Sequence, residues 1–248
     1  VVHSVRSRND FSWAVSNQCH VVSGEYLLTR NSALGKADVT RLKLLELLAL
    51  VAQDADTEAL EEVFKQQPKL SYGLLRLVNS AAIAPRSPIT SFGQAINLLG
   101  RRQLQRWLQL LVYADSGNGA APNPLLLLAA RRGRLMEILS GRIPAIPEVE
   151  STADAAFMAG TFSLLPVLLN LSMTEILPQL PLPQPVADAL AHHGGALGKL
   201  LKISDSADHG ELALAGSLVR EHAISPDTFV GDQIEALTWA AKIRSVAA

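Results

Sequence analysis

The stretch LLRLVNSAAIAPRSPITSFGQAINLLG, residues 74–100, decides the fold of this chain. It begins as an apolar helix, breaks into small and polar residues around Pro85 and Pro88, and resumes as an amphipathic helix that ends at Gly100. A proline fixes its own φ and restricts the residue before it, so two prolines favour a stiff corner between two helices. The segment is therefore either a catalytic loop or a structural corner.

The bulk composition indicates a globular, core-rich protein. Of the 248 residues, 48% are hydrophobic and 18% are charged, which is typical of a chain that buries a sizeable core. Leu and Ala dominate and aromatic residues make up only 5%, which favours helices over sheets. The net charge of -1 argues against a nucleic-acid partner. The single cysteine, Cys19, cannot form an internal disulfide, which favours a reducing compartment.

Helical signals run from about residue 36 to the end of the chain. Only residues 19–31, CHVVSGEYLLTRN, show short β-like runs. The longest apolar stretch, residues 155–169, is shorter than the roughly 20 residues that a membrane span needs. No signal-peptide pattern opens the sequence. We therefore expect an all-α, cytoplasmic protein with no membrane partner.

The residues that most helical enzymes use for catalysis are thinly represented. No two histidines are four residues apart, and no histidine is followed by Asp. His192 and His193 are adjacent, so on a helix they point about 100° apart, and we expect a helix end before Gly194 where imidazoles meet free carbonyls. Common phosphate-binding loops and the nucleophile elbow are missing from the sequence. We predict no catalytic residue, no metal and no cofactor.

Arginines gather in two predicted helices and leave two interpretations open. They could form a basic face for a phosphate or an acidic partner. The interpretation that we favour is a solvated helix face with salt bridges to local acids. Trp107, which lies among them, is expected to pack in the core. The arginines are Arg101, Arg102, Arg106, Arg131, Arg132, Arg134 and Arg142.

The opening stretch resembles the HDOD family, a divergent relative of the HD-type metal phosphohydrolases. The resemblance lies in LVNSA at residues 77–81, the corner at Pro88 and Ile89, QAI at residues 94–96, and LLG at residues 98–100. It continues to about residue 240. The resemblance implies a compact, all-α, multi-helix HD-related bundle, which we expect to span residues 36–248.

The same resemblance implies that the metal centre of the HD relatives has been lost. After AFMAG those relatives carry a His-Asp pair, whereas this chain has Thr161, Phe162, Ser163 and Leu164. Arg131, or a close neighbour, stands about where the first histidine ligand would be.

A second resemblance covers the N-terminal piece. Residues 12–31, SWAVSNQCHVVSGEYLLTRN, are similar to the decayed end of an EAL domain, the cyclic di-GMP phosphodiesterase barrel, with Ser23 in place of a Gln. This resemblance implies that residues 1–35 are a short β-like remnant of such a domain plus a linker.

We therefore expect a bacterial, non-catalytic signalling module that controls an EAL-type domain through protein contacts, with a homodimer left open. Two alternatives remain: a sensor of a nucleotide or another anionic small molecule, and a metal-dependent phosphohydrolase with atypical ligands. Asn79 is expected to cap or bridge the backbone at the corner. The candidate interaction residues are Asn79, Arg86, Gln94, Arg102 and Arg131.

Overall fold

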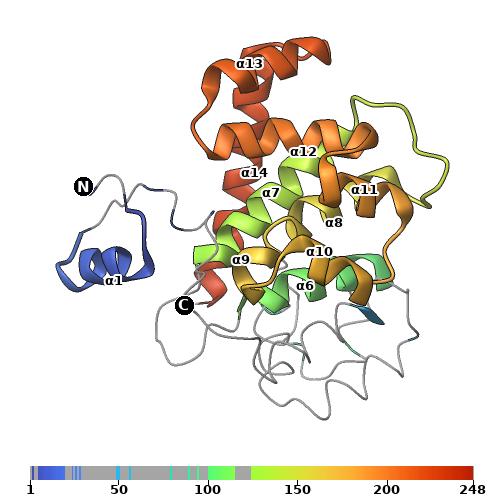
Figure 1. The fold of residues 1–248 in the computed structure, drawn as a ribbon. Coiled ribbons are helices and arrows are strands. Elements are labelled where there is room, and N and C mark those ends of the chain that lie inside the picture. The colour runs from blue at the N-terminus through green and yellow to red at the C-terminus, as the bar shows by residue number, and fades with distance from the viewer. Residues whose placement is uncertain are drawn as a thin grey trace.

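The computed structural model of the chain is a bundle of helices (Figure 1). It describes residues 2, 5–19, 24, 26, 28, 49–50, 56, 79, 89, 94, 100–114 and 124–247. Most of the described residues are helical, so the predicted all-α class is confirmed.

Two helices form the centre of the bundle. α7 (Pro124–Ser140) packs along α8 (Thr152–Phe162), and glycines allow this close approach. A Cβ at Gly160 would lie 2.8 Å from the Arg132 carbonyl oxygen and 2.9 Å from the Gly133 Cα, which is closer than real Cβ atoms come. The close crossing brings the backbone of α7 at Arg132 next to the end of α8.

α6 (Arg101–Ala114) and α14 (Pro226–Ala247) complete the core around this pair. Trp107 is buried, which confirms its predicted place in the core, and it stacks on Trp239 with ring centroids 5.9 Å apart. The buried Tyr113 hydroxyl donates a 2.6 Å hydrogen bond to the Thr161 carbonyl oxygen. Burial raises the pKa of Tyr113 above its ordinary value, so its phenol remains a neutral donor.

α11 and α12 form a second layer on α7 and α8, whereas α13 lies at the top of the view against α12 and α14 (Figure 1). α11 and α12 pack on each other as a hairpin, and α12 also contacts α7 and α8. Ser172 and Glu175 form a capping box at the start of α10. The elements are α9 (Leu165–Leu169), α10 (Met173–Ile176), the 3₁₀ helix η2 (Leu177–Gln179), α11 (Gln184–His192), α12 (Gly195–Asp208) and α13 (Leu212–Glu221).

Short-range signals mark several helix starts. The Ser151 hydroxyl accepts a 3.2 Å hydrogen bond from the Asp154 amide at the start of α8. Pro124 and Pro226 are the first residues of α7 and α14. Gly100 has a φ of 71°, a left-handed conformation that glycine adopts readily, directly before α6, and the helix predicted to end there lies outside the described residues.

The N-terminal region contains a helix that the sequence pattern did not predict, α1 (Arg8–Ser16). The Ser7 hydroxyl accepts a 3.1 Å hydrogen bond from the Asp10 amide and so caps this helix, while Asp10 Oδ2 accepts from the backbone amides of Arg6 and Ser7. The β-like runs predicted nearby lie largely outside the described residues. Among those described, Val2 takes part in a single bridge.

Thr152–Leu169 is an apolar stretch of 18 residues with a mean hydropathy of 1.5, long enough to be considered as a membrane span. In the fold, 56% of it is buried, and Ser163 and Leu164 separate its two helices. Both features are typical of core helices in a bundle.

Candidate functional site

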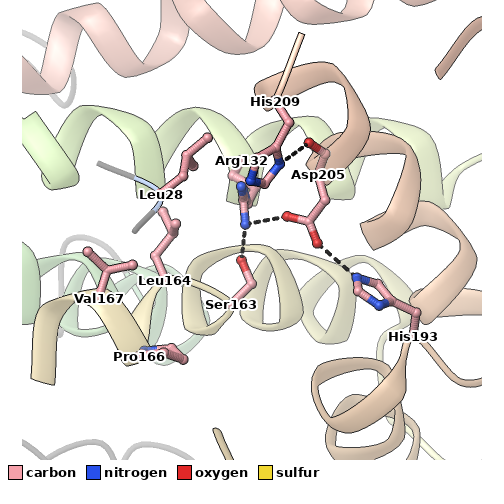
Figure 2. Close-up of a pocket in the computed structure, with 9 residues that line it drawn as sticks. All are labelled: Leu28, Arg132, Ser163, Leu164, Pro166, Val167, His193, Asp205 and His209. Carbon is pink, nitrogen blue, oxygen red and sulfur yellow. Dashed lines mark hydrogen bonds and ion pairs between the residues drawn. The ribbon is translucent and has the colours of Figure 1, made fainter. Parts of the chain in front are cut away.

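A buried arginine lies where the end of α8 meets α7 and α12. Arg132 projects from α7, Ser163 follows the last turn of α8, and Asp205 and Asp208 are on α12. Figure 2 shows Arg132 between Ser163 and Asp205, with His193 on the far side of the carboxylate. The side chains of Arg132 and Asp208 are each only 3% exposed. We call Arg131, Arg132, Ser163, His193, Asp205 and Asp208 the Arg132 cluster.

The guanidinium of Arg132 is directed at three neighbours. Its Nε and Nη2 donate to Asp208 Oδ2 at 3.0 and 2.7 Å. Its Nη1 donates to Ser163 Oγ at 2.7 Å and lies 2.8 Å from Asp205 Oδ1. Ser163 Oγ in turn donates to the Gly160 carbonyl oxygen at 2.7 Å. A buried charge needs such pairing, because each ion loses its hydration.

The charges within the cluster balance. Arg131 also forms an ion pair with Asp208, through Oδ1. Two guanidinium groups therefore face the carboxylates of Asp205 and Asp208, and the sum is zero while the neighbouring imidazoles are neutral. Because Asp205 and Asp208 are three residues apart on one helix, both carboxylates reach the same face of α12.

His193 ties the end of α11 to this cluster. It caps α11 in the left-handed conformation, with a φ of 55°, and its Nε2 lies 2.8 Å from Asp205 Oδ2. The prediction that this imidazole meets free backbone carbonyls is therefore wrong, because a carboxylate on the next helix is its partner. His209, at the end of α12, does bond a carbonyl: its Nδ1 lies 2.8 Å from the Asp205 oxygen.

Opposing effects act on the Asp205 carboxyl. Burial alone would raise its pKa. The hydrogen bond from His193, together with the positive charge of Arg132, outweighs burial and holds the pKa of Asp205 below its ordinary value of 3.8. Asp205 is therefore a stable anion at neutral pH.

A pocket of about 410 Å³ opens beside the cluster. Its polar wall contains Arg132, Asp205 and His193, while Leu164 and Val167 form part of an apolar wall. Figure 2 shows these two walls on opposite sides of Ser163. Because Arg132 already bonds its own carboxylates, the polar wall offers a neutral, pre-paired surface rather than an open positive charge.

A second ionic network joins α6, α7, α8 and α14 near the surface. Arg106 Nε and Nη2 donate to Asp154 Oδ1 at 2.8 and 2.5 Å, and its Nη1 lies 2.7 Å from Glu137 Oε1. Arg102 also pairs with Asp154 and donates to the Ser151 hydroxyl. Arg134 extends the network by bridging Glu137 and Glu235, each at 2.7 Å. We call Arg102, Arg106, Arg134, Glu137, Asp154 and Glu235 the Asp154 network.

These contacts decide between the two interpretations of the arginines. Salt bridges to acids are confirmed. The prediction of a solvated face with local partners is wrong for Arg132, which is buried and pairs with α12, and Arg106 pairs with Asp154, 48 residues away in sequence. Sequence spacing could not show this, because the partners come from helices that only the tertiary fold brings together.

The predicted interaction residues are scattered over the fold. The Asn79 side chain donates to the Ile89 carbonyl oxygen at 2.7 Å and accepts from the Ile89 amide at 2.6 Å, so the expected bridge across the corner is confirmed. Gln94 is helical and exposed, and Arg86 lies outside the described residues. Arg102 belongs to the Asp154 network and Arg131 to the Arg132 cluster.

The sequence analysis missed most of the cluster. Arg132 was noted only as one arginine among several, and Asp205 and Asp208 were not singled out. The available signal was two acidic residues three apart at the end of one predicted helix. At the expected metal position, Thr161, Phe162 and Leu164 are buried, while Ser163 hydrogen-bonds Arg132. Within the described part of the chain, no three His, Cys, Asp or Glu side chains are grouped to hold a metal ion.

Comparison with known proteins identifies the class. Residues 39–160 match the model of the HDOD domain family. This match confirms the predicted resemblance to the HDOD family over that part of the chain.

Two curated proteins and one solved structure are similar to it. The chain is 31% identical over 162 residues to the cyclic di-GMP phosphodiesterase CdgJ of Vibrio cholerae, a match that covers 65% of this chain and 36% of CdgJ. It is 26% identical over 208 residues to the uncharacterized protein YuxH of Bacillus subtilis, covering 82% of this chain and 49% of YuxH. The MmoQ response regulator of Methylococcus capsulatus aligns at 18% identity over 82% of this chain and 97% of its own, with a TM-score of 0.33.

The chain thus spans less than half the length of the curated relatives it matches. Its HDOD domain and its similarity to a protein of cyclic di-GMP metabolism associate it with signalling.

Proposed function

We propose that this chain is a non-catalytic signalling module that acts through protein contacts and regulates an EAL-type phosphodiesterase domain. The Arg132 cluster carries the proposal. Two carboxylates on α12 converge beside the positions that the resemblance to HD relatives assigns to metal ligands, and a protein guanidinium lies between them. A fixed positive charge that hydrogen-bonds both aspartates competes with any divalent ion for the same oxygens.

The corner at Asn79 supports a structural role for the opening stretch. Both ends of the Asn79 amide bond the backbone of the buried Ile89. An amide that satisfies one backbone donor and one acceptor fixes the path of the chain, as a side-chain bridge does in a turn. This arrangement favours a scaffold corner over a catalytic loop.

The similarity to CdgJ supports the link to an EAL-type domain, since that relative is named a cyclic di-GMP phosphodiesterase. The resemblance of residues 12–31 to the end of an EAL domain agrees with this link. On this proposal the module acts in the cytoplasm, on a neighbouring domain or on a separate protein.

The test has two arms. The purified chain is assayed for hydrolysis of cyclic di-GMP and of bis(para-nitrophenyl) phosphate with Mn²⁺ or Fe²⁺, and we expect no turnover above the blank. In CdgJ, the matching segment is deleted or replaced by this chain, and cyclic di-GMP hydrolysis is measured. We expect deletion to change the turnover and replacement to return it toward that of intact CdgJ. Turnover by the isolated chain would contradict the non-catalytic role, and a replacement equal to the deletion would contradict the coupling.

The pocket beside His193 favours a second candidate function, the sensing of a small ligand. Its volume of about 410 Å³ suits a small organic molecule, with one apolar and one polar wall. Thermal shift of the chain with cyclic di-GMP tests this candidate. A ligand at 100 times its dissociation constant stabilises the folded state by about 2.7 kcal/mol, so the absence of a shift at high ligand concentration excludes that nucleotide.

A further inference from the structure

The last helix, α14, carries two apolar faces. Phe229, Ala236, Ala240 and Ile243 are buried on the face that packs into the core, where α14 contacts α7. In a helix that covers a core from one side, the remaining surface is expected to be polar. The remaining surface of α14 is not uniformly polar.

Three large apolar side chains lie on a second face of α14. At about 100° of rotation per residue, this face is roughly 110° around the helix axis from the buried face. Val230 is 52% exposed, Ile234 is 60% exposed and Leu237 is 48% exposed. Single exposed apolar residues are ordinary on protein surfaces, but a continuous row of them marks an interaction site.

The spacing of this row specifies the shape of what covers it. Val230, Ile234, Leu237 and the exposed Ala241 follow one another at intervals of four, three and four residues. This is the a/d pattern of a coiled coil, in which each side chain inserts between residues of a facing helix. We call these four residues the outer seam.

We propose that the outer seam is the contact surface for the same helix of a second copy of this chain, in an antiparallel pair. If the two-fold axis of the pair passes between Glu235 and Ala236, each residue of the outer seam faces another residue of the outer seam on the partner helix. Ile234 then faces the partner's Leu237, and Val230 faces the partner's Ala241. A large residue meets a small one at each end, and two large residues meet on either side of the axis, so the packing is filled without gaps.

Charges at the two ends of the seam favour the antiparallel direction. In the sequence, Asp227 precedes Val230 by three residues, and Arg244 follows Ala241 by three, so both continue the same register. In the antiparallel pair position 227 shares a layer with position 244 of the partner, so the sequence assigns one acidic and one basic residue to that layer. In a parallel pair the residue at each of these two positions would face the same residue of the partner, and like charges at facing positions are destabilising.

The size of the seam sets the expected strength. From residue 227 to residue 244 the helix rises about 26 Å, at about 1.5 Å per residue. One helix pair of this length is smaller than a standard interface of about 800 Å² per partner, so we expect a weak, reversible dimer. The inference does not rest on the proposed function, because the pairing needs only α14.

The first experiment measures the oligomeric state of the full 248-residue chain by sedimentation velocity from about 1 to 100 µM. We expect a monomer–dimer equilibrium for the native chain. Ile234→Glu places a charge in both halves of the seam and is expected to weaken the dimer about 100-fold or more. Leu212→Glu on α13 is the matched control, because Leu212 is 72% exposed and lies outside the seam. The dissociation constant of the Leu212→Glu dimer should equal that of the native dimer within about twofold.

The second experiment reads the direction by cross-linking in a Cys19→Ser background. With Val230→Cys and Ala241→Cys together, oxidation should give a covalent dimer, because an antiparallel pair brings these two positions together. Each single-cysteine variant should give little covalent dimer, since the two copies of position 230, for example, are about 16 Å apart along the helix axis. Cross-linking by each single variant would indicate a parallel pair and overturn the proposed register.

Circular dichroism accompanies both experiments, and if Ile234→Glu fails to fold, the cross-linking pattern alone decides. A native chain that stays monomeric throughout overturns the proposal. So does a dimer that Ile234→Glu leaves unchanged. If the Val230→Cys variant is monomeric and its introduced thiol is shielded from thiol reagents, another part of the same chain covers the seam, and this also overturns the proposal.

Discussion

The Arg132 cluster and the Asp154 network use the same chemistry in different surroundings. Both join arginines of one helix to aspartates of another helix that are distant in sequence. In the first, the side chains of Arg132 and Asp208 are 3% exposed, whereas in the second Arg102 is 61% exposed. The comparison separates the effect of an ion pair from the effect of its burial.

Burial changes what is lost when one partner is removed. At the surface, water solvates the remaining charge, and an exposed pair contributes about 0–1 kcal/mol. In the interior the remaining charge has no such alternative, and removing one partner of a buried pair costs about 3–5 kcal/mol. The Arg132 cluster should therefore be sensitive to single substitutions, and the Asp154 network tolerant of them at its exposed end.

The largest effect is expected for Arg132→Ala. The substitution leaves Asp205 and Asp208 without their shared guanidinium, and we expect the free energy of unfolding to fall by about 3–5 kcal/mol. Urea denaturation measures it. Arg132→Lys, which keeps the charge but not the forked geometry, should fall between the native chain and Arg132→Ala.

Arg131→Ala is the matched control, since Arg131 shares the Asp208 partner but is 16% exposed. A loss for Arg131→Ala equal to that for Arg132→Ala would show that burial is not the deciding variable.

The next effect concerns divalent ions. If Arg132 supplies the positive charge that the two aspartates need, Mn²⁺ should stabilise Arg132→Ala by about 1–3 kcal/mol while leaving the native chain unchanged. Thermal unfolding with and without Mn²⁺ measures the difference. Adding Asp208→Asn should abolish the stabilisation, because it removes one of the carboxylates. An equal Mn²⁺ shift in the native chain would mean that the guanidinium does not occupy the place of a cation.

Much of the fold could be predicted from the sequence because its signals are local. The helical signals predicted from about residue 36 onward agree with α6 and α7, and Ser151 and Ser172 cap their helices through bonds that reach only three residues. The cluster could not be predicted in this way. Arg132 and Asp208 are 76 residues apart and meet only because Gly133 and Gly160 let α7 and α8 pack closely, with α12 on top. Nothing in a single sequence distinguishes Arg132 from Arg134.

A smaller effect should appear at acid pH. The pKa of Asp205 lies below its ordinary value, so its ionised form favours the folded state. This contribution is fully present above pH 3.8, the ordinary value, and is lost as the pH falls below 3.8 through the folded pKa. Asp205→Asn should therefore be less stable than the native chain at pH 6, with a gap that narrows below about pH 4.

Unfolding free energies measured from pH 6 to about pH 2.5 give this gap. His193→Ala removes the leading hydrogen bond that lowers the pKa of Asp205, so in that background the pH-dependent part of the gap should be smaller and its loss should end nearer to the ordinary value. A gap that stays constant across this range would show that Asp205 does not titrate with folding.

The smallest effect is expected at the exposed end of the Asp154 network. In Arg102→Ala, Asp154 still accepts two hydrogen bonds from Arg106 and remains in the first turn of α8, where the helix dipole favours a carboxylate. We therefore expect a loss of at most about 1 kcal/mol, most of which should disappear in about 1 M salt because solvent-exposed charges are screened. Urea denaturation at low and high salt measures both quantities. Arg132→Ala should keep most of its loss at high salt, since the Asp208 carboxylate is only 3% exposed. If the two variants instead responded alike to salt, burial would not be what distinguishes the two networks.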